Sequence, residues 1–84
     1  MKFAVYILKS QQTGKFYIGQ TGDIQQRLIS HNRGDSFSTR NGRPWVLVYE
    51  EEYPSRSEAM KREKYLKSIQ GWNELKRIKS KLES

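Results

Sequence analysis

The chain has 84 residues, of which 35% are hydrophobic and 12% aromatic, and its formal net charge is +7. This length predicts one domain over residues 1–84 without a separate targeting or regulatory module, and the basic balance favours a polyanionic partner, most commonly nucleic acid. The lack of cysteine excludes disulfides and thiolate zinc sites. No apolar run approaches the ~20 residues that span a bilayer, and the start MKFAVYILKS is too short and alternating for a signal peptide, so we expect a cytoplasmic protein.

The first elements predicted along the chain are two strands and a helix. Residues 3–8 carry apolar side chains on both faces, which is typical of a central strand covered on both sides. A polar turn at residues 11–14 leads to a second strand at residues 16–19, so the two strands form an antiparallel hairpin. Asp23, with Gln26 three residues later, indicates a capping box that begins a helix running to about residue 32.

A loop, a third strand and two helices follow. Residues 33–44 are rich in glycine, serine and arginine, residues 45–49 are typical of a strand, and we expect the acidic run 50–52 to end that strand on the solvent side. Ser55 and Glu58 form a second capping box, and the inward residues of the helix before Gly71 are expected to be Ala59, Leu66 and Ile69.

The last helix is predicted from about Asn73, with Leu75, Ile78 and Leu82 on one face. Most of its basic side chains lie off that face: Lys76, Arg77, Lys79 and Lys81. The element order ββαβαα therefore predicts an α+β fold, in which a small three-stranded antiparallel sheet is flanked by helices.

Glu63 departs from the pattern of its helix, because it lies on or beside the apolar stripe. One interpretation is that it stays at the edge of the stripe and pairs with Lys67 one turn later, a contact worth roughly 0.3–0.5 kcal/mol. The other interpretation is that its carboxylate points inward and holds a metal ion in a cleft.

Two tyrosines, an arginine and the single histidine allow two interpretations as well. Tyr6 and Tyr17 are either ordinary sheet aromatics or two phenols brought together on one face of neighbouring strands. Arg27 and His31 lie one helical turn apart and so share a face. They are either solvated charges at the helix end, where the dipole favours cations, or groups that converge on a phosphate.

The ordered motifs resemble those of the GIY-YIG nuclease family, which includes the catalytic domain of the excision-repair nuclease UvrC and many small stand-alone bacterial proteins. AVYIL at residues 4–8 and YIG at residues 17–19 are similar to the paired signature of the family, although Ala4 and Val5 stand where its name has Gly and Ile. RLISHN at residues 27–32 and LVYEEEYPSRSEAMKREKYLK at residues 47–67 resemble its later elements. The resemblance covers residues 3 to about 82.

The resemblance implies a metal-dependent endonuclease that hydrolyses phosphodiester bonds in nucleic acid, DNA rather than RNA, and acts as a monomer. The implied catalytic residues are Tyr6, Tyr17, Arg27, His31 and Glu63, with Glu63 as the ligand of Mg²⁺ or Mn²⁺, and we expect them to line one concave surface. The implied substrate-binding residues are Gly19, Gln20, Arg33, Arg40 and Lys67. The alternative is a non-catalytic nucleic-acid-binding module that keeps the fold and uses its basic surface; a protein–protein adaptor is a third possibility.

Overall fold

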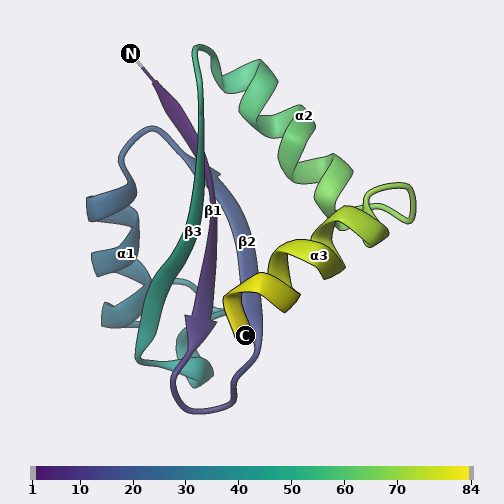
Figure 1. Ribbon diagram of the computed structural model, residues 1–84. Coiled ribbons are helices and arrows are strands. Elements are labelled where there is room, and N and C mark those ends of the chain that lie inside the picture. The colour runs from purple at the N-terminus through teal and green to yellow at the C-terminus, as the bar shows by residue number, and fades with distance from the viewer. Residues whose placement is uncertain (1, 84) are drawn as a thin grey trace.

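The computed structural model describes residues 2–83 and has the predicted α+β architecture. In chain order the elements are β1 (Phe3–Ser10), β2 (Phe16–Thr21), α1 (Ile24–Arg33), the short 3₁₀ helix η1 (Arg40–Gly42), β3 (Trp45–Tyr53), α2 (Arg56–Lys67) and α3 (Trp72–Glu83). The three strands are antiparallel, in the order β2-β1-β3. Figure 1 shows α1 on one side of the sheet and α2 and α3 on the other.

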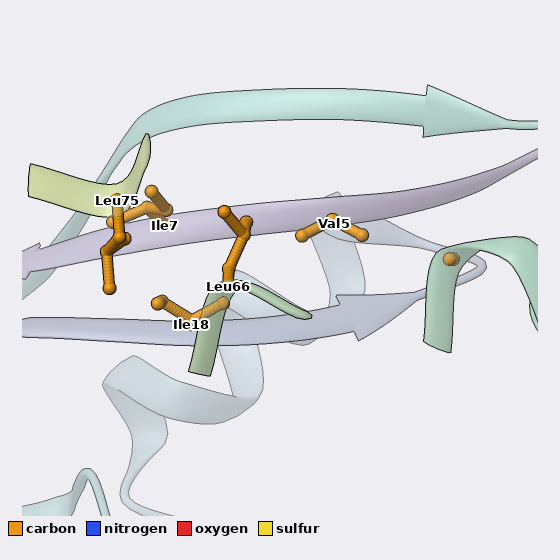
Figure 2. Packing of buried hydrophobic residues seen from close by; sticks show 6 residues of the cluster. Val5, Ile7, Ile18, Leu66 and Leu75 are labelled. Atoms are coloured by element: carbon orange, nitrogen blue, oxygen red, sulfur yellow. The ribbon is translucent and has the colours of Figure 1, made fainter. Parts of the chain in front are cut away.

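The central strand β1 is buried on both faces because helices cover both sides of the sheet. Its odd-numbered residues Val5 and Ile7 pack with Ile18 of β2 and with side chains of α2 and α3, including Leu66 and Leu75 (Figure 2). Its even-numbered residues pack in a second cluster against α1; the members are Tyr6, Leu8, Tyr17, Ile24, Leu28 and Trp45. The alternation predicted from the sequence therefore divides the core into two layers.

Both predicted helix starts are confirmed. The Asp23 carboxylate accepts a hydrogen bond from the backbone N–H of Gln26 at 3.1 Å, and the Ser55 hydroxyl accepts one from the N–H of Glu58 at 3.3 Å. Each bond satisfies an N–H that the first turn of a helix leaves without a partner. α1 ends at Gly34, whose φ of 87° is readily adopted only by glycine.

The acidic run 50–52 does not end the third strand, which continues to Tyr53. Glu51 points toward α2 and accepts hydrogen bonds from Arg62, Tyr49 and Tyr53, and Arg62 also pairs with Glu74 of α3. Burial opposes a charge on Glu51, yet these donors hold its pKa at about 2. The strand prediction was wrong at this end because a buried partner, invisible in the local pattern, stabilises the carboxylate.

Two details of the helices also differ from the prediction. α2 ends at Lys67, with Ser68 as its C-cap, so Ile69 lies beyond the helix and is 92% exposed instead of facing inward. Gly71 is buried against the backbone of Tyr65, where a Cβ atom would collide with the carbonyl oxygen. None of the helices within residues 2–83 is long and apolar enough to cross a membrane.

Candidate active site

A chain of buried hydrogen bonds through three side chains, Tyr6, His31 and Thr39, connects β1, α1 and the loop after α1. The hydroxyl of Tyr6 lies 3.0 Å from Nε2 of His31, and Nδ1 of His31 lies 2.8 Å from the hydroxyl of Thr39. Tyr6 and His31 are each 2% exposed and Thr39 is fully buried. Because both ring nitrogens of His31 have partners, its ring is held in one orientation, directed at the tyrosine.

Gly19 of β2 makes room for this chain. It is the register partner of Tyr6, and a Cβ atom at position 19 would lie 2.5 Å from the Tyr6 hydroxyl and 2.7 Å from Cζ. Real Cβ atoms do not approach other atoms so closely, so any side chain here would displace the phenol. The family resemblance implies that Gly19 admits a substrate; the structure gives it the additional task of admitting the Tyr6 ring.

Tyr17 lies over the same chain. Its ring centroid is 5.0 Å from that of His31 and 6.4 Å from that of Tyr6, and the ring of Trp45 contacts it from β3 at 6.4 Å. The two tyrosines therefore share one face of neighbouring strands, as one of the two sequence interpretations requires. The tilted and edge-on ring angles are those that aromatic pairs favour.

Charges on both sides of this cluster act on Tyr6. Burial raises the pKa of the Tyr6 phenol, the nearby Tyr17 and the carboxylate of Glu63 raise it further, and the guanidinium of Arg27 lowers it. Burial and the charge of Arg27 both lower the pKa of His31, so the ring is neutral at neutral pH. His31 is therefore not the exposed, helix-end cation of the alternative interpretation.

Glu63 forms the ion pair that its local interpretation predicts. Its Oε2 lies 2.7 Å from Nζ of Lys67, and that ammonium is also 5.8 Å from the centre of the Tyr17 ring. α2 packs against the opposite layer of the core, so Glu63 and Lys67 reach the Tyr17 side past β2, the edge strand of the sheet. Glu63 is therefore both paired with Lys67 and close enough to Tyr6 for its charge to act on the phenol.

The donor chemistry here fits a hard divalent cation. Within residues 2–83 no group of three or more histidine, cysteine or acidic side chains is arranged to hold a metal, but Mg²⁺ keeps several waters and needs only one or two carboxylates plus substrate oxygens. Glu63 offers one carboxylate, of which the ion pair engages only Oε2. Among residues 2–83, the amide oxygen of Gln20, in the edge strand β2, is buried without a hydrogen-bond partner.

The loop after α1 is fixed to both α1 and β3. The carbonyl of Thr39 accepts a hydrogen bond from the indole N–H of Trp45 at 2.7 Å, and Asn32 bonds the backbone N–H and C=O of Trp45. The Ser10 hydroxyl of β1 donates to the carbonyl of Gly42 at 2.6 Å. These contacts hold Thr39 in place beside His31.

The predicted site residues converge only in part on one hollow. Arg27 and His31 line a surface hollow together with Ser30, Asp35 and Ser36. Tyr6 and Tyr17 connect to it through His31, by the hydrogen bond and the ring contacts. Glu63 is not among the residues that line the hollow, and its carboxylate acts on Tyr6 only through its charge.

The remaining predicted binding residues have partners of their own. Arg33 is exposed and pairs with Asp35 at 2.6 Å, which offsets its charge. Arg40 is exposed and donates through Nε to the carbonyl of Gly34 at 3.0 Å. Arg40 therefore keeps its charge available at the surface, whereas Arg33 shares its charge with a carboxylate.

Two residues that contact the cluster are not among the sequence candidates, Thr39 and Trp45. Thr39 lies in a polar loop without periodicity, eight residues after His31, so no helix or strand spacing relates the two. The sequence pattern assigns Trp45 only to a strand. Its contacts with Tyr17 and the Thr39 carbonyl depend on the strand register, which single-strand patterns do not reveal.

Comparison with known proteins agrees with the motifs. The family described as the GIY-YIG catalytic domain matches residues 2–76. A UPF0213 protein of Staphylococcus saprophyticus is 40% identical over 78 residues, which cover 92% of this chain and 94% of that protein. A second, from Staphylococcus haemolyticus, is 38% identical over 81 residues, covering 95% of this chain and 98% of that protein.

A solved structure is similar as well. The solution NMR structure of a UPF0213 protein of Bacillus halodurans has a TM-score of 0.54 and 34% sequence identity, and the match covers 94% of this chain and 86% of that one. The paired AVYIL and YIG strands, the fold and these relatives lead to one assignment: the chain belongs to the GIY-YIG nuclease family, among its small bacterial members.

Proposed function

We propose that the protein is a metal-dependent endonuclease that hydrolyses phosphodiester bonds in nucleic acid, and in DNA rather than RNA. The observation that carries the proposal is the buried Tyr6–His31 pair beneath Tyr17, with Arg27 and Glu63 close enough to shift the pKa of Tyr6 from opposite directions. Two phenols, a permanently charged guanidinium and a carboxylate are the kinds of group that phosphodiester hydrolysis needs.

In this proposal Tyr6 orients the attacking water. Its raised pKa keeps the phenol protonated, so it donates to Nε2 of His31 while its oxygen accepts a hydrogen bond from the water. His31, neutral and held by Thr39, fixes the direction of that hydroxyl. A phenol that stays protonated is a poor base, so another residue must take the proton of the attacking water.

Tyr17 takes the proton of the water as general base. A phenol becomes a base only where positive charge nearby stabilises its phenolate, and Arg27 and the divalent cation would supply that charge. Arg27 binds the scissile phosphate and offsets the charge that develops on it, which suits a planar guanidinium that is always protonated. As the water oxygen bonds to phosphorus, the bond from phosphorus to the leaving oxygen breaks, and the leaving oxygen takes a proton from solvent water.

Glu63 would hold Mg²⁺ or Mn²⁺. The amide oxygen of Gln20, three residues after Tyr17 in β2, is proposed as a further donor to the cation. When bound, such a cation supplies Lewis-acid stabilisation of the phosphate oxygens. Gly19 and Lys67 line the approach to Tyr17, and Arg33 and Arg40 contact the phosphates of the bound strand. The enzyme is proposed to act as a monomer, since each chain carries one complete set of these residues. Its proposed location is the cytoplasm.

The experiment that tests the proposal compares two variants with two matched controls. Glu63→Gln should abolish Mg²⁺-dependent cleavage of labelled DNA while binding is kept, because the carboxylate is lost but the size is not. Glu58→Gln removes an exposed carboxylate from the same helix and should cleave normally. Tyr17→Phe should lower turnover about 10²–10⁴-fold, whereas Tyr65→Phe should not.

All four variants must melt like the parent protein for the comparison to hold. Full cleavage by folded Glu63→Gln would show that this glutamate serves only as the partner of Lys67. Nucleic-acid binding without cleavage by the parent, with Mg²⁺, Mn²⁺ or chelator, would favour the alternative of a non-catalytic binding module.

A further inference from the structure

An aromatic side chain stands exposed beside the proposed site. Phe37 is 87% exposed, and it lies at the tip of a tight turn in which the N–H of Thr39 donates to the carbonyl of Ser36 at 3.3 Å. The hydroxyls of Ser36 and Ser38 are 3.2 Å apart across the same turn. The turn thus presents Phe37 to solvent from a closed, hydrogen-bonded base.

Both ends of this turn belong to the site. Ser36 lines the hollow that Arg27 and His31 share, and Thr39 bonds Nδ1 of His31. Phe37 is therefore one residue from the lining of the hollow and two from the residue that orients the histidine.

A cation accompanies the exposed ring. The guanidinium carbon of Arg40 lies 5.9 Å from the centre of the Phe37 ring, and Arg40 is itself exposed. The guanidinium lies over one face of the Phe37 ring. An aromatic ring with an arginine over one face combines the two elements of sequence-tolerant single-strand binding: a stacking surface for a base and a positive charge for the backbone.

We propose that Phe37 and Arg40 form a stacking site for an unpaired base next to the scissile phosphate, so that the substrate is single-stranded at that position. The proposal rests on the proposed function, whose hollow it adjoins. The base must be unpaired because in a duplex both of its faces are covered by its neighbours, and a single protruding ring reaches only a face that is free.

Binding of labelled oligonucleotides in the presence of chelator, without cleavage, tests this site separately from catalysis. The probes are single strands of about 12 nucleotides, as DNA and as RNA, and a blunt DNA duplex of the same sequence. Phe37→Ala should weaken single-strand binding about 5- to 150-fold, the equivalent of about 1–3 kcal/mol. Duplex affinity should change less than about twofold, because phosphate contacts dominate there.

Two further variants make the result specific. Phe37→Trp keeps an aromatic face and should retain or tighten single-strand binding. Ile69→Ala removes the other strongly exposed hydrophobic side chain, 92% exposed between α2 and α3, and should change neither affinity. A strand carrying 2-aminopurine, whose fluorescence reports stacking, should change its emission on binding the parent and not Phe37→Ala.

Equal losses on single strand and duplex, no loss on either, or no measurable single-strand binding by the parent would each overturn the stacking site. Failure of the nuclease proposal is distinguishable: Phe37→Ala would weaken single-strand binding selectively, yet the parent would cleave none of the probes with Mg²⁺ or Mn²⁺.

Discussion

The close approach of Gly19 to Tyr6 makes a quantitative prediction for Gly19→Ala. The new Cβ atom would lie 2.5 Å from the Tyr6 hydroxyl, where carbon and oxygen normally stay more than about 3.0 Å apart. The ring of Tyr6 cannot swing aside freely, since it is 2% exposed and packs in the cluster with Leu8 and Trp45. Either the phenol leaves His31 or the strands separate locally.

The size of the effect follows from this geometry. Overpacking a tight site by one methyl group costs about 1–3 kcal/mol, and leaving His31 without the Tyr6 hydrogen bond adds about 1 kcal/mol. The helix- and strand-forming gain of alanine over glycine offsets about 0.5–1 kcal/mol. The net loss of about 1–3.5 kcal/mol predicts a Tm lowered by about 6–20 °C for a domain of this size.

Thermal unfolding followed by circular dichroism measures this shift, and a cleavage assay measures the displacement of Tyr6. Gly22→Ala is the matched control, because its Cβ atom would meet only the edge of the Phe3 ring, at 3.1 Å. Adding Tyr6→Phe to Gly19→Ala removes the nearest clashing atom and should restore part of the lost Tm, but no activity. Gly19→Ala that melts within about 2 °C of the parent and cleaves normally would refute the close approach.

Three further predictions concern the surroundings of the site. Thr39→Val should lower the free energy of unfolding by about 1–3 kcal/mol and reduce cleavage, because Nδ1 of His31 loses its partner. Thr39→Ser keeps the hydroxyl and should restore both stability, measured by denaturant titration, and turnover. Glu51 should make stability depend on pH in the acid range, because folding lowers its pKa from 4.5 to about 2. The stability that it contributes, about 3 kcal/mol, is present above about pH 4.5 and is lost as the pH falls toward 2. In Glu51→Gln the free energy of unfolding should therefore depend less on pH between 4.5 and 2. Neutralising the basic side chains of α3 should lower the log–log salt slope of DNA binding by about 0.9 for each phosphate that the protein no longer neutralises, and an unchanged slope would place the DNA on another surface. The side chains to neutralise are Lys76, Arg77, Lys79 and Lys81.

The fold was predictable where local chemistry decides it. Asp23 and Ser55 start helices because each side chain satisfies a backbone N–H of its own helix, and neither bond needs a distant partner. The prediction was wrong where a distant partner decides. Glu51 lies within β3, and its carboxylate accepts hydrogen bonds from Tyr49, Tyr53 and the distant Arg62 of α2. Ile69 is exposed because α2 ends at Lys67, before the position that the apolar spacing assigned to its inward face.

The arrangement of the candidate site was predictable only in part. The proximity of Tyr6 and Tyr17 follows from strand pairing, because Tyr17 pairs with Leu8, which lies two residues from Tyr6 on the same face of the sheet. The burial of His31 does not follow from its helix, on which it merely lies one turn after Arg27. It depends on Thr39, in a loop whose position is set by hydrogen bonds to Trp45 and not by any repeat.

Neighbouring residues of α2 connect the stability of the fold to the proposed site. Arg62 is clamped between Glu51 of β3 and Glu74 of α3 by side chains that are largely buried, and this fixes the rotation of α2 about its axis. The next residue, Glu63, projects about 100° further round the helix, past the edge strand β2 toward Tyr17 and Lys67. Because β2 pairs with β1 alone, its outer side leaves space for a carboxylate of one layer to act on a phenol of the other. A further strand paired to β2 would cover this edge, so the proposed catalysis requires β2 to stay at the edge of the sheet.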